Sequence, residues 1–371
     1  MENLFDYLHW RGDLTFSQVP PGPVDALIFS ALSYITFDGC VAERPDIPLS
    51  LRDAAEEFFQ LGDIKERCRI RFDLNLLRSA AQTRRFGNTL ILRFRDVLIP
   101  EEDTQFAALT FLLDNNTGFV AFRGTDYSLT GWKEDFNMSF QESIPAQRLA
   151  KQYIAELYSR YPMPLYLAGH SKGGNLAVYA AVKSEKQIRD RILAVYNHDG
   201  PGFTDYVMED PAYLELVPRI STIIPQSSVI GMLLEHREPY TIIKSKQIGL
   251  LQHDFYSWEL DGPGFVPMER VTADSKFLDQ TIKNWVSGMS NQDRNELVDA
   301  VFDLLGSGDV NSVFDLIHPK NIHTYLKTLT TDGKLRRALS EELLSLMEAA
   351  RKTQLSLGNK DTEDTEIPGG S

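Results

Sequence analysis

The segment LYLAGHSKGGNLAVYAA, residues 165–181, joins a short apolar run to a run of small residues through a glycine-rich turn. Residues 169–173 within it fit the pattern G-x-S-x-G, with Ser171 at the tip of the turn. Between a strand and a helix, this pattern places the serine in a strained turn, and the glycines let helix and strand approach closely. The following helix directs its N-terminal N–H groups toward the serine. The segment therefore predicts that Ser171 is a nucleophile.

Strand-like and helix-like runs alternate on both sides of this segment. Asp, Asn and Gly at residues 114–118 separate two runs rich in β-branched and aromatic residues, which predicts a hairpin. A helix is expected over 146–161, where apolar residues recur on one stripe. The expected strands are 89–99, 104–113, 119–122, 165–168, 192–197, 219–225 and 240–245. This alternation predicts a mostly parallel sheet covered by helices on both faces.

The strands stop at about residue 270, and the pattern then changes. Amphipathic helices are expected over 274–289, 294–308 and 337–353. We therefore expect one α/β domain over 1–270, including an N-terminal extension, and a helical C-terminal region over 271–355. The polar tail, 356–371, is expected to be disordered because it offers little apolar surface to bury.

Composition restricts the partners of the chain. The formal net charge is −14 and the pI is about 5.0, which argues against a nucleic-acid partner. No apolar run approaches the roughly 20 residues of a membrane-spanning helix, and the N-terminus lacks the apolar core of a signal peptide. Cys40 and Cys68 have neither metal-ligand spacing nor a disulfide pattern. We expect a cytoplasmic protein without a metal or organic cofactor, and its oligomeric state is left open.

Two blocks carry a resemblance to a known family. VAFRGTD, residues 120–126, followed by LAGHSKGG, residues 167–174, resembles the class 3 (fungal-type) lipase core of the α/β-hydrolase fold over about 104–256. The chain is also similar, up to about residue 347, to an uncharacterised lipase-like family of Gram-positive bacteria. This second likeness is carried by the blocks DYLHWRGDLTF, AFRGTD with GWKEDFNMSF, GHSKGGNLAVYAA, DGPGF, IIPQSSVIGMLLEH and QHDFYSW. The resemblance implies an α/β-hydrolase fold and ester chemistry, and a lipid-like acyl substrate by analogy.

A serine nucleophile needs a base and an acid that orients it, and in this fold the chain order is Ser, Asp or Glu, His. The histidines that follow Ser171 are His198, His236, His253, His318 and His323. His253 lies in a loop just beyond the expected strand 240–245, where the fold places its catalytic histidine. We therefore predict that His253 is the base; the alternative is a surface histidine beside Asp254.

The acid is less clearly marked. In class 3 lipases it lies in a segment that aligns here with residues 223–231, IIPQSSVIG, which contain no carboxylate. Asp199 directly follows the expected strand 192–197, and the DGPG turn can fix a side chain at a strand end. We predict Asp199 as the acid, with Glu235 as the alternative. An Asx-turn role explains an Asp before Gly-Pro equally well.

Two donors must stabilise the oxyanion that develops during acyl transfer. One is expected to be the backbone N–H of Lys172, the residue after the nucleophile. The resemblance implies that the other is Thr125, through its backbone N–H and its hydroxyl. The Lys172 side chain is expected either to attract an anionic group or to be exposed at the helix N-terminus. Residues 131–140 are assigned no chemistry.

These residues predict a serine hydrolase that cleaves a carboxylic ester, small or lipid-like, through an acyl-enzyme on Ser171. An acyltransferase with the same acyl-enzyme is one alternative. A non-catalytic binding or scaffold protein with the hydrolase fold is another, and the missing carboxylate in 223–231 is its best support.

Overall fold

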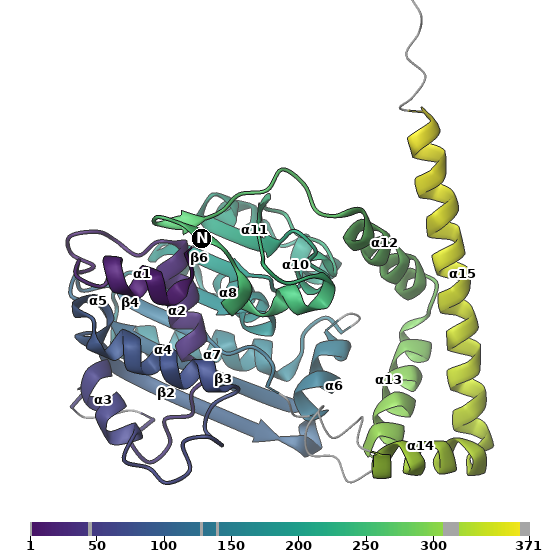
Figure 1. Ribbon diagram of the computed structural model, residues 1–371, viewed down its shortest axis with the longest axis horizontal. Coiled ribbons are helices and arrows are strands. Elements are labelled where there is room, and N and C mark those ends of the chain that lie inside the picture. The colour runs from purple at the N-terminus through teal and green to yellow at the C-terminus, as the bar shows by residue number, and fades with distance from the viewer. Residues whose placement is uncertain (1, 44–46, 127–128, 139–140, 307–318, 364–371) are drawn as a thin grey trace, which may run out of the picture. The chain divides into compact units, whose positions relative to one another are not determined.

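The computed structural model describes residues 2–43, 47–126, 129–138, 141–306 and 319–363. The chain divides into two compact units, Met1–Arg270 and Val271–Ser371 (Figure 1).

The first unit is built on an eight-stranded sheet whose strands lie side by side in chain order. Strands β1 to β4 pair antiparallel, and β4 to β8 pair parallel. The strands are β1 (Leu49–Ser50), β2 (Leu90–Ile99), β3 (Thr104–Leu112), β4 (Gly118–Phe122), β5 (Leu165–His170), β6 (Ile192–His198), β7 (Ile220–Pro225) and β8 (Tyr240–Ile243). A separate hairpin joins β9 (Leu260–Asp261) to β10 (Gly264–Phe265). The expected α/β-hydrolase fold with a mostly parallel sheet is confirmed.

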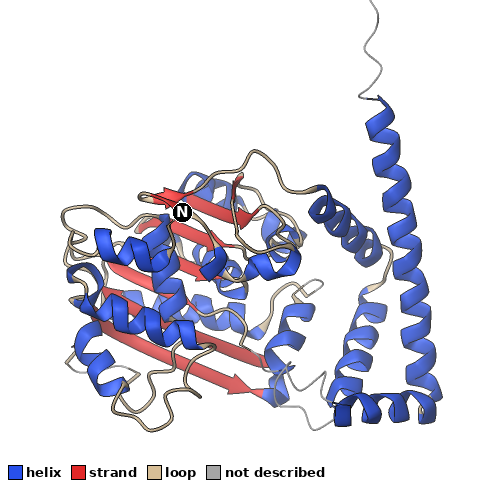
Figure 2. Cartoon of the chain, in the orientation of Figure 1, coloured by secondary structure: helices blue, strands red, loops and turns tan. Residues whose placement is uncertain are grey.

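Helices lie on both sides of the strands (Figure 2). They are α1 (Leu4–Arg11), α2 (Pro23–Leu32), α3 (Leu51–Phe58), α4 (Arg71–Gln82), α5 (Arg84–Gly87), α6 (Leu129–Asn137), α7 (Pro145–Arg160), α8 (Lys172–Val182), α9 (Lys186–Arg189), α10 (Asp205–Met208) and α11 (Pro211–Leu216). Two short 3₁₀ helices, Gly249–His253 and Phe255–Ser257, follow β8.

Alternate residues of each strand face the two layers of helices. In β4, Phe119 and Ala121 join the core formed with α1 to α4, whereas Val120 and Phe122 join the core formed with α7, α8 and α11. This is the period of two that a strand buried on both faces requires. Residues 24–32 of α2 are all buried, and α2 packs on β5 and β4. The N-terminal extension therefore forms one of the two covering layers of the sheet.

A buried ion pair joins the N-terminal helices. The Arg85 guanidinium of α5 donates to both carboxylate oxygens of Asp25 in α2, at 2.7 and 2.8 Å. It also donates to the carbonyl of Val19, while the Tyr7 hydroxyl of α1 donates to Asp25 at 2.9 Å. Both charges are almost fully buried, so neither can be replaced without leaving the other unpaired.

We predict that Asp25→Asn lowers the free energy of unfolding by about 3–5 kcal/mol, because it leaves the Arg85 charge buried without its partner. Urea unfolding measures the change. Asp190→Asn is the control, because the Asp190–Lys186 pair is exposed and such pairs contribute below about 1 kcal/mol. Equal losses in the two variants would contradict the role given to the buried pair.

The second unit is helical in its described part. It contains α12 (Ala273–Ser287), α13 (Asn291–Gly306), α14 (Pro319–Thr331) and α15 (Gly333–Glu363). Helix α12 packs along α15, and Asn284 donates to the Thr353 hydroxyl at 2.9 Å. Helices were expected here, although α14 was not among them.

The expected disorder of 356–371 is corrected in its first part, because α15 continues to Glu363. The polar composition indicates a lack of apolar packing, but nothing in it stops a helix before Pro368. The interior Gly358 costs only about 1 kcal/mol relative to alanine. Residues 364–371 of this expected tail lie outside the described residues.

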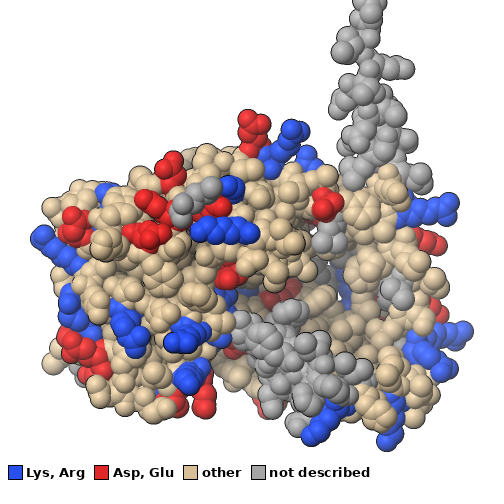
Figure 3. Space-filling view, in the orientation of Figure 1, with Lys and Arg blue, Asp and Glu red and all other residues tan. Residues whose placement is uncertain are grey.

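Among the helices of the described ranges, none combines the length and the apolar character that crossing a membrane requires. On the face of the first unit that Figure 3 shows, basic and acidic side chains are intermixed. This face therefore presents no continuous basic stripe of the kind that binds a phosphate backbone.

Candidate active site

Ser171 occupies the turn between β5 and α8, with φ 59° and ψ −134°. Such a backbone conformation costs a non-glycine residue on the order of 1–3 kcal/mol and persists only where its surroundings enforce it. The Ser171 N–H donates to the carbonyl of His198 on β6 at 2.9 Å. A Cβ on Gly169 would lie 2.0 Å from the carbonyl carbon of Gly173, so strand and helix touch backbone to backbone at this point. Close packing of β5 against α8 therefore holds the strained serine.

Asp199 directly follows β6, is fully buried and has a φ of 52°. Its N–H donates to the carbonyl of Ile223 on β7 at 2.8 Å. One carboxylate oxygen, Oδ2, lies 2.7 Å from Nδ1 of His253. The other oxygen, Oδ1, accepts from the Ser228 hydroxyl at 2.5 Å and from the Gly231 N–H at 3.2 Å. The structure thus brings together the residues predicted as acid and base.

Residues 223–231, where class 3 lipases would have their acid, here hold the Asp199 carboxylate instead. Ser228 and Gly231 both donate to it, and a Cβ on Gly231 would lie 2.4 Å from Asp199 Oδ1. Glu235, the alternative acid, is exposed, and its backbone pairs with Phe203. The role of Ser228 was missed, since a serine in a loop has no sequence signal for a contact with a residue 29 positions earlier.

His253 ends the 3₁₀ helix Gly249–His253 and lies beside the turn of Ser171. Its ring centroid is 4.5 Å from that of His170, the residue before the serine. Nε2 of His170 lies 2.9 Å from the His253 carbonyl, which can only accept, so Nε2 carries a proton. Nδ1 of His170 then accepts from the Tyr34 hydroxyl, at 2.9 Å. Burial holds the pKa of His170 well below its usual value, so its ring is neutral at pH 7 and fixes the backbone of His253.

The predicted oxyanion loop runs alongside the serine. A Cβ on Gly124 would lie 3.1 Å from the Cβ of Ser171 and 2.5 Å from the carbonyl of His170. The next residue, Thr125, donates its hydroxyl to Asp135 of α6 at 2.5 Å. The expectation that this hydroxyl points at the oxyanion is therefore wrong, because its single proton is engaged elsewhere. The Thr125 backbone N–H is the group left for that role.

The expected positions of the Lys172 side chain, exposed or available to an anionic group, are also wrong. The side chain is 1% exposed, and its ammonium group donates to Glu134 Oε2 at 2.9 Å. It also donates to the side-chain and backbone oxygens of Gln105 at 2.9 and 3.1 Å. The reason is that α6 places Glu134 beneath the N-terminus of α8. Two adjacent carboxylates, Glu134 and Asp135, just after the oxyanion loop were the available signal for this cluster.

The pKa of Asp135 is also shifted. Burial raises its pKa from 3.8 to about 6, and the Lys172 ammonium and the Thr125 hydroxyl oppose this rise. The carboxyl group is nevertheless about one-third exposed, so solvent screens part of the cost of its charge.

The other histidines are held elsewhere. His198 is buried, its Nε2 lies 3.0 Å from the carbonyl of Pro23, and burial lowers its pKa to about 4. His236 lies 3.0 Å from the Gly231 carbonyl and 3.2 Å from Glu238. His323 lies on α14, and His318 falls outside the described residues.

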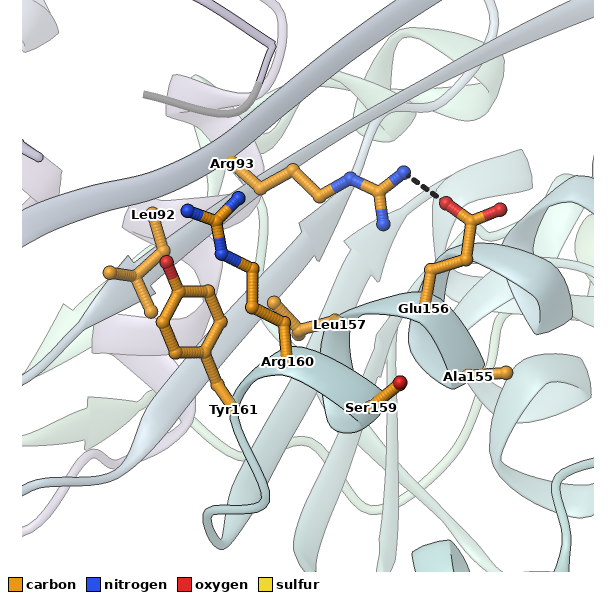
Figure 4. Close-up of a pocket in the computed structure, with 8 residues that line it drawn as sticks. All are labelled: Leu92, Arg93, Ala155, Glu156, Leu157, Ser159, Arg160 and Tyr161. Atoms are coloured by element: carbon orange, nitrogen blue, oxygen red, sulfur yellow. Dashed lines mark hydrogen bonds and ion pairs between the residues drawn. The ribbon is translucent and has the colours of Figure 1, made fainter. Parts of the chain in front are cut away.

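A cavity of about 460 Å³ lies between β2 and the C-terminal end of α7 (Figure 4). Arg93 and Glu156 form an ion pair of 2.6 Å across it. It is lined by Leu92, Arg93, Ala155, Glu156, Leu157, Ser159, Arg160 and Tyr161. None of the residues predicted for the active site is among them. Within the described ranges, no three His, Cys, Asp or Glu side chains gather as a metal site would require.

A family model described as Mbeg1-like matches residues 80–303. The chain belongs to the Mbeg1-like family. None of the curated proteins compared with it matches. The Gram-positive origin expected for this Mbeg1-like chain stays a prediction.

Lipases are among the solved structures that the chain is similar to. A Rhizomucor miehei lipase–propeptide complex is 18% identical with a TM-score of 0.31, covering 42% of this chain and 57% of the lipase chain. M37 lipase is 14% identical with a TM-score of 0.38, covering 56% of this chain and 69% of the other. A triacylglycerol lipase from Penicillium expansum is 12% identical with a TM-score of 0.30, covering 42% and 70%.

We predict that Asp135→Asn changes the pH dependence of stability. A pKa raised to about 6 means that the folded chain binds more protons than the unfolded chain between pH 4 and 6. Stability of the wild type therefore falls as pH rises through this window, and the variant lacks this fall. Urea unfolding at several pH values measures it.

Asp63→Asn is the control. Arg67 lowers the pKa of Asp63, so removing the Asp63 carboxylate changes the pH dependence of stability in the opposite direction. The same pH dependence in wild type and Asp135→Asn would show that Asp135 does not titrate as described.

Proposed function

We propose that the protein is a serine hydrolase that cleaves carboxylic esters through an acyl-enzyme on Ser171. The hydrogen bond of 2.7 Å between Asp199 and His253 carries the proposal, because it joins two residues predicted independently as acid and base. Its support is the position of this pair beside the strained turn that presents Ser171. A nucleophile, a base and a group that orients the base form the minimum set for this chemistry.

The proposed mechanism follows from the proton positions. Asp199 accepts the proton on His253 Nδ1, which leaves Nε2 free to take the proton of the Ser171 hydroxyl. The serine oxygen then attacks the ester carbonyl, and the N–H groups of Thr125 and Lys172 stabilise the oxyanion. His253 returns the proton to the leaving alcohol. A water molecule, deprotonated by the same histidine, then hydrolyses the acyl-enzyme.

We propose an acyl ester with an apolar, lipid-like chain as the substrate. Large apolar side chains are exposed just before the base: Ile248 is 79% exposed, Leu250 61% and Leu251 63%. Phe136, which directly follows Asp135, is also exposed. An apolar chain leaving the site along these residues would cover surface that is otherwise in water.

Two alternatives were an acyltransferase and a non-catalytic scaffold protein. The best support for a scaffold protein was the missing carboxylate in 223–231, and the hydrogen bonds from Ser228 and Gly231 to the Asp199 carboxylate count against it. An acyltransferase would use the same residues and differ only in the acceptor, and no observation favours it. The mechanism uses no cofactor, and a cytoplasmic location stays a prediction.

We predict that Ser171→Ala abolishes hydrolysis of short p-nitrophenyl esters without unfolding the chain, because it removes one oxygen from a packed turn. His253→Ala should lower kcat by several orders of magnitude, since nucleophile and base act as one unit. Steady-state assays with circular dichroism as the folding check measure both. His323→Ala on α14 is the control, and turnover that survives in folded Ser171→Ala would refute the proposal.

We predict that Asp199→Asn lowers kcat by about 10² to 10⁴, because the imidazole can then adopt the wrong tautomer. Glu235→Gln should cost less than about tenfold, since this exposed side chain is not the partner of His253 in the structure. The same ester assay compares them. A larger loss in Glu235→Gln than in Asp199→Asn would show that the acid has been misassigned.

A further inference from the structure

Lys172, whose backbone N–H is a proposed oxyanion donor, has a buried side chain. We infer that Lys172 is a positioning residue: its ammonium group, held between Gln105, Glu134 and Asp135, fixes both oxyanion donors in place. This inference rests on the proposed function, because it concerns how the same site is held.

The ammonium group of Lys172 is fully hydrogen-bonded. Lys172 is the first residue of α8, so its backbone N–H is the donor that follows the nucleophile. Its ammonium group has three protons and three acceptors within 3.1 Å, two on Gln105 and one on Glu134. With every donor paired, the side chain ties the first turn of α8 to the start of β3 and to α6.

Glu134 is fully buried and has further donors of its own. The N–H of Gln105 donates to it at 3.1 Å, and the N–H of Ala146 at the start of α7 donates at 2.9 Å. Together with Lys172 these contacts join α6 to β3, α7 and α8. Helix α6 is therefore fixed at the residue that meets the lysine.

Asp135, the next residue of α6, holds the second donor. It accepts the hydroxyl proton of Thr125 at 2.5 Å, and its other oxygen lies 3.7 Å from the Lys172 ammonium. The two donors of the proposed oxyanion hole are thus connected through two consecutive carboxylates that face one ammonium group. A buried ion pair adds little net stability compared with apolar residues of similar volume, so stability alone does not account for this arrangement.

The charge on Lys172 also influences the protonation state of Asp135. The titratable groups that face this carboxyl are Lys172 from α8, Glu134 from α6, His253 from its 3₁₀ helix and Tyr34 from the loop after α2. Burial raises the pKa of Asp135 to about 6, and the Lys172 ammonium acts against this rise. Without the ammonium, Asp135 takes up its proton at higher pH. A protonated Asp135 donates to Thr125 instead of accepting from it, which changes how the loop is held.

The test is the pH profile of kcat/KM for ester hydrolysis in Lys172→Met. We expect a loss of about 10- to 100-fold at pH 8, less than the 10²–10³ that follows complete removal of an oxyanion donor. The acid limb of the profile should also move to higher pH by about one unit, as expected for loss of an opposite charge near a carboxylate. Lys183→Met, at the other end of α8 and paired with Asp210, is the matched control and should keep the wild-type profile.

A second variant separates positioning from folding. Lys172→Met combined with Glu134→Gln removes the carboxylate that the single change leaves unpaired, so its urea midpoint should recover toward the wild type. We expect the reduced kcat/KM at pH 8 to remain. The acid limb should return part of the way, because the Glu134 carboxylate itself raises the pKa of Asp135 and the second change removes it. Recovery of the rate at pH 8 together with the midpoint would overturn the inference, because Lys172 would then matter only for folding.

The failures of the two proposals are distinguishable. An active wild type together with a folded Lys172→Met variant that keeps both rate and acid limb refutes the positioning role alone. A wild type that does not hydrolyse esters refutes the proposed function and the positioning role with it.

Discussion

The contact between β5 and α8 is the constraint on which the site depends. Gly169 lets β5 approach α8, and Gly173 lets α8 approach the end of β4 at Phe122, each to a distance that a side chain would not allow. This packing holds Ser171 in its strained conformation. The Ser171 N–H also donates to the last residue of β6, the strand that Asp199 directly follows. The position of the serine and the start of the acid loop are therefore set by the same parallel strands.

Two polar networks hold the groups next to this contact. On one side, Ser228 and Gly231 orient Asp199, which orients His253. On the other side, Glu134 and Asp135 hold Lys172 and Thr125. The Lys172 ammonium group and both carboxylate oxygens of Asp199 are fully paired, and such pairing in a low-dielectric interior favours a single geometry. This is the kind of preorganisation that stabilising a transient oxyanion requires.

Much of the sheet and the turn of the nucleophile could be predicted from residues that are close together in the sequence. Strands β2 to β8, the helix at 146–161 and the turn at Ser171 each have a signal within a dozen residues, and the structure has all of them. Strand β1, of two residues, had no such signal. Asp199 and His253 could be proposed from chain order, because parallel strands end at one edge of the sheet.

Contacts between distant segments could not be predicted in this way. The sequence pattern around Lys172 predicts an exposed lysine, because it does not show that α6 places Glu134 next to it. In the same way, it does not show that the Thr125 hydroxyl donates to Asp135. Ser228 likewise acquires its role only when β6 and β7 lie side by side. The helical continuation to Glu363 was missed for another reason, since a polar composition lowers packing without breaking a helix.

Reaction with a fluorophosphonate probe, followed by mass spectrometry of the labelled peptide, tests the central claim most directly. Only a serine activated by a base reacts rapidly with such a probe, and the reaction needs no knowledge of the substrate. The expected result is one adduct on Ser171 that forms in the wild type and fails to form in folded His253→Ala. No adduct, an adduct on another residue, or equal labelling of the two proteins would contradict the assignment of Ser171 as a nucleophile activated by His253.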